Sequence, residues 1–169
     1  MRIMICTAWM IVAAICSAAA FADEPSAGRL DHVSIRVSDV KKSAAFYEAL
    51  FGLKELKNPF PGGGGVVWLD LGNGIALHIF GGMTSKVTDE RERHLAMTVP
   101  DMSKVTAFLA SHKIAWQNFD GVAGQVQTRP DGVQQLFFRD PDGYWIEVND
   151  ALKGSGGHSR GDGNRQPLR

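Results

Sequence analysis

Three histidines and one glutamate lie at positions where they could bind a metal ion together. Glu147 sits in an apolar, aromatic-rich segment that follows the Asp142-Gly143 turn, where glycine supplies the backbone conformation of a tight hairpin. Because burying an unpaired charge is unfavourable, this carboxylate needs a partner. The candidate partners are His32, His78 and His94. Imidazole nitrogens and carboxylate oxygens suit a divalent ion such as zinc, nickel, iron, cobalt or manganese.

An internal repeat accounts for the spacing of these residues. Two pairs of segments align without gaps: residues 31–46 with 93–108, and residues 72–79 with 141–148. The first alignment matches His32 with His94, and the second matches His78 with Glu147. Each copy therefore contributes two candidate ligands, and both lie at positions that the other copy also fills with a candidate ligand. Chance seldom produces such a match.

The repeat predicts an α+β fold built from two βαβββ modules. In each copy an alternating strand leads to an aspartate, Asp39 or Asp101, that can cap the N-terminus of a helix. Short strands are expected after each helix, at residues 53–57, 66–71 and 75–80 in the first copy and at 114–118, 134–139 and 144–149 in the second. The polar, glycine-rich run at 120–132 is interpreted as an insertion in the second copy.

The alternation of side chains along each strand places the candidate ligands on one face. Helices must cover the face that carries Val33, Ile35 and Val37, so His32 and its three counterparts point to the free face. Any one histidine could be an ordinary strand residue, but four matched inward positions favour a metal site. For His78 three roles stay open: metal ligand, hydrogen-bond donor to another ligand, or catalytic base.

The two ends of the chain differ in composition from the domain between them. Residues 1–22 have a basic start, a short apolar middle and small residues before Ala22, which is typical of a secretory signal peptide. We expect cleavage after Ala22, a periplasmic or secreted location, and no stable membrane anchor afterwards. A lipoprotein site at Cys16 is disfavoured because Ile15 before it is bulky. The expected organisation is a signal peptide at 1–22, a linker at 23–29, a domain at 30–150 with modules 30–81 and 93–150, and a disordered glycine-rich tail at 151–169.

Cysteine content and charge exclude several classes of function. Both cysteines lie within residues 1–22, so the exported chain has no disulfide, thiolate nucleophile or cysteine-ligated cluster. The formal net charge is +0 at pH 7, from 18 basic and 18 acidic residues, and no basic stripe is present. This pattern argues against nucleic acid as a partner.

The chain resembles the vicinal oxygen chelate superfamily in four segments: residues 31–39, 46–47, 52–53 and 140–147. That superfamily contains glyoxalase I, fosfomycin-resistance proteins, methylmalonyl-CoA epimerase and extradiol dioxygenases. The resemblance covers residues 30–149 and implies that two βαβββ modules curl into an open cup around one metal ion. It also implies that His32, His94 and Glu147 are metal ligands. His78 departs from the pattern, because glyoxalase I-like members usually carry glutamate there and the epimerases carry glutamine.

The mechanism that the resemblance implies is chelation of two neighbouring substrate oxygens by the metal, which stabilises the charge that develops on them. Glu147 or His78 would then move a proton as the catalytic group. We therefore expect an exported, metal-dependent lyase or isomerase of glyoxalase I-like type that acts on a small oxygen-chelating substrate and forms a homodimer. Trp145, Phe80 and Trp68 are candidates for the wall of the cup, although an aromatic strand residue is more often simple packing.

Two alternatives belong to other classes of function. His32, His94 and Glu147 could form an iron triad with open positions for oxygen, which would give a ring-cleaving extradiol dioxygenase. The chain could also be a binding protein of the bleomycin-resistance kind, which holds a small molecule in the cup without chemistry. The bound metal and the dependence of turnover on oxygen would distinguish these alternatives.

Overall fold

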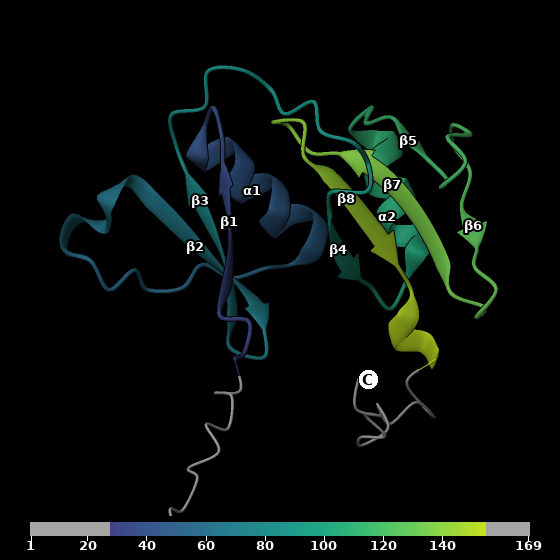
Figure 1. Ribbon diagram of the computed structural model, residues 1–169, viewed down its shortest axis with the longest axis horizontal. Helices are drawn as coiled ribbons and strands as arrows, with labels where there is room; N and C mark the ends of the chain where they lie inside the picture. The colour runs from purple at the N-terminus through teal and green to yellow at the C-terminus, as the bar shows by residue number, and fades with distance from the viewer. Residues whose placement is uncertain (1–27, 155–169) are drawn as a thin grey trace, which may run out of the picture.

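The structure of the chain is a computed structural model in which residues 28–154 are described (Figure 1). The predicted signal peptide at 1–22 and most of the predicted tail lie outside these residues. The first residues of that tail are described, and they form a short 3₁₀ helix, η2 (Ala151–Gly154), rather than an unstructured segment. In the described part of the chain neither α-helix has the length and apolar composition needed to span a bilayer.

The first module is a three-stranded sheet with one α-helix. Its elements are β1 (His32–Arg36), α1 (Val40–Phe51), η1 (Pro61–Gly65), β2 (Val66–Gly72) and β3 (Ile75–Phe80). The strand order is β1-β3-β2, with β1 parallel to β3 and β2 antiparallel to it. Asp39 caps α1 by accepting a hydrogen bond from the Lys42 backbone N–H at 3.0 Å. The helix ends at Gly52, whose φ of 69° is readily adopted by glycine.

The second module repeats this arrangement with additional strands. Its elements are β4 (His94–Thr98), α2 (Met102–Ser111), β5 (Trp116–Gln117), β6 (Gln127–Thr128), β7 (Gln134–Arg139) and β8 (Trp145–Asn149). The strand order is β4-β8-β7-β5, and β4 runs parallel to β8 as β1 does to β3. Asp101 caps α2 as predicted, accepting from the Ser103 backbone N–H at 2.9 Å. The duplicated βαβββ plan is therefore confirmed.

The edge strands are shorter than the sequence predicted. The strand expected at 53–57 is reduced to an isolated bridge between Glu55 and Leu69, and the strand expected at 114–118 keeps only Trp116–Gln117. The first of these segments still pairs with β2, because the Leu56 backbone N–H donates to the Trp68 carbonyl at 2.7 Å and the Asp70 N–H donates to the Lys54 carbonyl at 2.8 Å. The insertion at 120–132 contributes β6, which pairs with the same outer edge of β7 beyond the end of β5.

A single hydrophobic core joins the two modules. It combines Ile35 of β1 and Val37, which follows that strand, with the buried faces of both helices and the inner faces of β7 and β8. Figure 1 shows α1 between the sheet of the first module and the sheet of the second module. From that helix the Phe46 ring lies edge-on to Phe138 of β7 and to Phe108 of α2, with centroids 6.2 and 6.3 Å apart respectively. The modules thus meet through the α1 layer, and the predicted ligand positions lie on the other face of each sheet.

Buried polar contacts also connect the first module to the turn between β7 and β8. The Asp142 carboxylate accepts hydrogen bonds from the Ser38 backbone N–H (2.8 Å), the Ser38 hydroxyl (2.7 Å) and the Ser43 hydroxyl (2.6 Å). The Tyr47 hydroxyl donates to Asp140 Oδ2 at 2.7 Å. Because both carboxylates are buried, these contacts satisfy groups that would otherwise be costly to bury.

Candidate metal centre

His32 and His78 lie side by side on the free face of the first module. They come from the adjacent parallel strands β1 and β3, where Ser34 pairs in register with His78. Their imidazole rings stack with centroids 4.2 Å apart and planes inclined by 8°. His32 Nδ1 lies 2.7 Å from the Asp31 Oδ2 atom. Since an ionised carboxylate only accepts, Nδ1 carries the proton and the Nε2 lone pair is left free, as in histidines that bind metals.

The ring of His78 is held on both faces by other rings. Trp68 of β2 stacks on the side opposite His32, with centroids 4.0 Å apart and an interplanar angle of 14°. Only 8% of His78 is exposed. Burial lowers the pKa of His78 and the neighbouring His32 lowers it further, although Asp31 acts in the opposite direction. The ring is therefore biased toward its neutral form, which can bind a metal or accept a proton.

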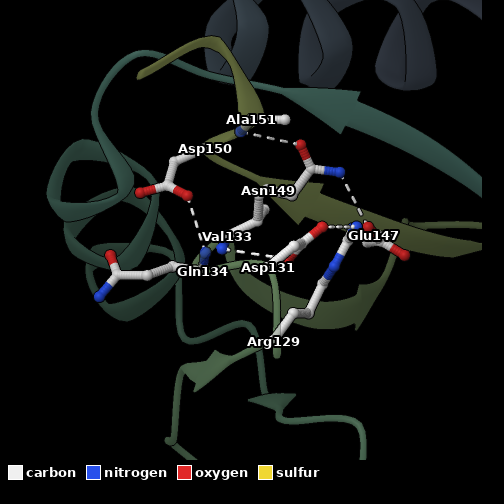
Figure 2. A network of polar contacts seen from close by, with 8 residues as sticks. All are labelled: Arg129, Asp131, Val133, Gln134, Glu147, Asn149, Asp150 and Ala151. Atoms are coloured by element: carbon white, nitrogen blue, oxygen red, sulfur yellow. Dashed lines mark hydrogen bonds and ion pairs between the residues drawn. The ribbon is translucent and has the colours of Figure 1, made fainter. Parts of the chain in front are cut away.

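His94 and Glu147 form the equivalent pair on the second module. They come from the adjacent parallel strands β4 and β8, where Ala96 pairs in register with Glu147. His94 Nδ1 lies 2.7 Å from the Arg91 carbonyl oxygen, and since a carbonyl only accepts, Nδ1 carries the proton. Glu147 Oε1 accepts a hydrogen bond from the Asn149 amide at 2.8 Å (Figure 2). His94 Nε2 and Glu147 Oε2 face one another at 3.2 Å and form an ion pair when the imidazole is protonated.

This pair has the spacing of two ligands of one cation. Two ligand atoms that each lie about 2.0–2.2 Å from a divalent ion are about 3.0–3.5 Å apart. A proton or a metal ion between His94 Nε2 and Glu147 Oε2 would satisfy both atoms. With 25% and 11% of their side chains exposed, the two groups are shielded but accessible. The donor set therefore fits a divalent ion.

The structure brings the predicted ligands together as two pairs and does not bring the pairs together within one chain. Within residues 28–154 no group of three or more histidine, cysteine, aspartate or glutamate side chains could hold a metal ion. The physical reason is that each pair lies on adjacent strands of its own sheet, and the sheets meet through α1 instead of through their free faces.

Sequence reasoning missed the groups that orient the ligands. Asp31 and Asn149 each lie within two residues of the ligand they hold, so their proximity was a usable signal. The carbonyl of Arg91 gave no such signal, since any residue has one. Trp145, a candidate for the cup wall, instead donates from Nε1 to the Asp89 carbonyl and lies under the Arg139 guanidinium.

A pocket of about 540 Å³ opens on the free face of the first module. Its lining includes His32, His78, Trp68, Phe60 and Phe80. Trp68 and Phe80 thus line a pocket as predicted for the wall of the cup.

The model of the Glyoxalase/Bleomycin resistance protein/Dioxygenase superfamily matches residues 29–148. The chain belongs to this superfamily. The match spans both βαβββ modules, so the fold predicted from the repeat and from the resemblance is confirmed.

Several known proteins are similar to this chain in sequence or in fold. Protein YwbC of Bacillus subtilis (strain 168) is 28% identical over 127 residues, which cover 72% of this chain and 96% of that protein. Glyoxylase I 4 of Arabidopsis thaliana is 28% identical over 129 residues, covering 70% of this chain and 68% of that protein. The solved structure of the trypanothione-dependent glyoxalase I of Leishmania major is 26% identical, with a TM-score of 0.56, and covers 77% of this chain and 91% of that one.

Proposed function

We propose that this superfamily member is an exported, divalent-metal-dependent enzyme of glyoxalase I-like type, a lyase or isomerase acting on a small oxygen-chelating substrate. The observation that carries the proposal is the pair formed by His94 Nε2 and Glu147 Oε2, which lie 3.2 Å apart, the separation of two ligands of one cation. The repeat-related His32, whose Nε2 is free, supports it. The likeness to glyoxalase I proteins agrees with this reaction class.

The metal site is completed by two chains of a homodimer. One chain offers two separate pairs of ligands, and a two-fold axis would bring the first-module pair of one copy to the second-module pair of the other. Such a dimer contains two identical sites. Each then has His32, His78, His94 and Glu147 available as metal ligands.

The bound ion would act as a Lewis acid that stabilises negative charge on two neighbouring substrate oxygens. The protein's own groups hold and move the proton. Glu147 is fixed at Oε1 by Asn149, so Oε2 is the atom that would hold the ion, and it could accept a substrate proton and return it only when released from the ion. The His78 ring edge lines the pocket and offers a second base.

Measurement of bound metal in the purified protein tests this proposal. We expect about one ion per chain in the wild type. His32→Ala and His94→Ala are expected to lose the ion, whereas the control His112→Ala keeps it, because that ring stacks on Phe108 at the end of α2. A wild-type protein without stoichiometric metal would contradict the proposal.

Co-expression of His32→Ala and His94→Ala under two affinity tags tests whether the site is shared. In the isolated heterodimer, a shared arrangement leaves one intact site of the two, hence about half an ion per chain. If each chain held its own complete site, every site in this heterodimer would be damaged and no ion would be retained. The two arrangements therefore predict different metal contents for the same sample.

Export is tested separately from chemistry. We propose that residues 1–22 are removed after Ala22, and N-terminal sequencing of the protein from a periplasmic fraction should then begin at Asp23. An intact Met1 on active protein would contradict export.

A ring-cleaving dioxygenase is the second candidate, and the stack of His32 on His78 favours it. Two parallel rings with centroids 4.2 Å apart do not direct both nitrogens at one ion without rotating. If His78 stays stacked, the remaining ligands are His32, His94 and Glu147, the set of two histidines and a carboxylate that is diagnostic of non-haem iron oxygenases. Bound iron(II) and turnover that requires oxygen would favour this reaction over isomerisation.

A further inference from the structure

Arg139, Trp145 and His94 form one row across three neighbouring strands of the second module. Arg139 of β7 pairs in register with Trp145 of β8, and Trp145 pairs in register with His94 of β4. Residues that pair in register lie on the same face of a sheet, so this row lies on the face that carries Glu147. The Arg139 guanidinium carbon lies 4.2 Å from the centroid of the Trp145 ring. A predicted metal ligand therefore stands at the end of a row that begins with an arginine.

The connector between β3 and β4, residues 81–93, is fastened to this row. Figure 1 shows the connector crossing from the first module to the second. Arg139 donates from Nη1 to the Val87 carbonyl at 3.3 Å and from Nη2 to the Asp89 carbonyl at 3.1 Å. The Asp89 carbonyl also accepts from Trp145 Nε1 at 3.1 Å. Three side-chain hydrogen bonds thus fix two carbonyls of the connector onto the row.

The same connector sets the orientation of His94. Two residues after Asp89, the Arg91 carbonyl accepts a hydrogen bond from His94 Nδ1 at 2.7 Å. That bond keeps the proton on Nδ1 and leaves the Nε2 lone pair for a metal ion. A turn in which the Arg93 backbone N–H donates to the Glu90 carbonyl at 3.1 Å joins the two anchor points. A displacement of the Asp89 carbonyl would therefore also displace the Arg91 carbonyl.

The contacts of Arg139 require the geometry of a guanidinium group. Its planar fork of N–H donors can hold the Val87 and Asp89 carbonyls together while its face lies on an indole ring. Arg139 also donates to the Gly143 carbonyl, and among residues 28–154 it forms no ion pair with a carboxylate. The arginine is thus committed to backbone carbonyls, and a glutamine in its place could not hold both connector carbonyls at once.

We propose that Arg139 is a positioning residue for His94. By holding the connector, it keeps the Arg91 carbonyl in place and so fixes His94 in the tautomer whose Nε2 can bind a metal ion. The inference rests on the proposed function for the role of His94 as a ligand, whereas the effect on the His94 tautomer follows from the contacts of the chain alone. The effect is specific to the second module, because His32 is oriented by its neighbour Asp31 instead.

Long-range ¹H–¹⁵N NMR of the histidine rings tests the tautomer. Spectra are recorded on metal-free protein at about pH 8, where an ordinary imidazole is neutral. We expect His94 to carry its proton on Nδ1 in the wild type and to become a mixture of both tautomers in Arg139→Gln. Arg139→Lys should restore part of the wild-type signal, since an ammonium group also donates to carbonyls. The His32 signal should stay unchanged in all samples. His94 protonated only on Nδ1 in Arg139→Gln would overturn the proposal.

Titration with Zn²⁺ against a competing chelator tests the consequence for metal binding. The dissociation constant should rise about 10- to 100-fold in Arg139→Gln, the usual effect of removing a group that orients a ligand, and less in Arg139→Lys. The control Arg129→Gln loses a guanidinium that pairs with Asp131 in the insertion, so it should bind Zn²⁺ as the wild type does. Wild-type affinity in Arg139→Gln would contradict the proposal.

The two measurements separate failure of this inference from failure of the proposed function. A wild-type protein that does not bind Zn²⁺ would contradict the metal enzyme, and the His94 tautomer would still decide the role of Arg139. Zn²⁺ binding together with an unchanged His94 tautomer in Arg139→Gln would overturn the inference and leave the metal enzyme standing. Mixed tautomers at both His94 and His32 would show general loosening of the fold and would contradict a specific positioning role.

Discussion

The imidazole rings of His32 and His78 lie parallel, with centroids 4.2 Å apart and planes inclined by 8°. Burial lowers the pKa of His78, and the neighbouring His32 ring lowers it further. The parallel planes also leave only one of the two nitrogens well directed toward a common ion. His32, whose Nδ1 is held by Asp31, is the better directed of the two.

This relationship predicts different outcomes for the two histidines. His32→Ala should lose the metal ion, whereas His78→Gln should retain it and lose activity by about 10²–10⁴-fold, as expected when a general base is removed. Metal content and turnover measured on the same preparations check both expectations. Loss of the ion in His78→Gln would instead make His78 a ligand, and rescue of turnover by His78→Glu would support the role of a base.

Tyr47→Phe should destabilise the fold by about 1.5–3 kcal/mol, because it removes a buried hydrogen bond to the Asp140 carboxylate. Urea unfolding followed by circular dichroism measures this loss. The matched control is Tyr144→Phe, whose hydroxyl bonds the exposed Arg36 backbone and should cost less. Equal effects of the two substitutions would show that burial of the Tyr47 contact adds nothing.

The free energy of unfolding should decrease at acidic pH because the Asp142 carboxylate becomes protonated. Burial opposes ionisation of this group, but hydrogen bonds from Ser43 and Ser38 outweigh burial and lower its pKa. A carboxyl group with a depressed folded-state pKa contributes stability that is fully present above its unfolded pKa of about 4 and is lost as the pH falls through its lower folded-state value.

Ser43→Ala removes one of these donors, so the acid unfolding midpoint should move to higher pH. Acid titration of tertiary structure by near-UV circular dichroism measures the midpoint, with Ser111→Ala as a control because that hydroxyl only bonds within the end of α2. An unchanged midpoint in Ser43→Ala would contradict the assignment to Asp142.

Gly143→Ala should be among the most destabilising single-methyl changes in the chain. Gly143 has a φ of 97°, and an added Cβ would clash with the Val87 carbonyl oxygen and also lie 3.2 Å from the Val87 nitrogen. We expect a cost of about 3 kcal/mol or more from strain and the clash together. Gly121→Ala is the control, since Gly121 has a φ of 85° and open space around it, and should cost about 1 kcal/mol. Thermal unfolding of both variants provides the comparison, and similar melting temperatures would argue that the chain around Val87 moves aside.

The amino-acid sequence by itself determined the features that depend on local periodicity. Strand alternation put His32, His78, His94 and Glu147 on the free faces, because neighbouring strand residues point in opposite directions. Helix caps at Asp39 and Asp101 were equally readable, since a cap acts within one helical turn. Duplication of the module then followed from matching these local patterns.

Only the tertiary structure decided which faces meet. The contact of Phe46 with Phe138 joins segments far apart in the chain and places α1 between the sheets, which keeps the pair His32 and His78 apart from the pair His94 and Glu147. The role of Trp145 also depended on a distant partner, the Asp89 carbonyl. Burial of apolar surface between remote segments governs which faces pack together. Because this burial has no preferred direction, no local pattern of residues encodes the packing.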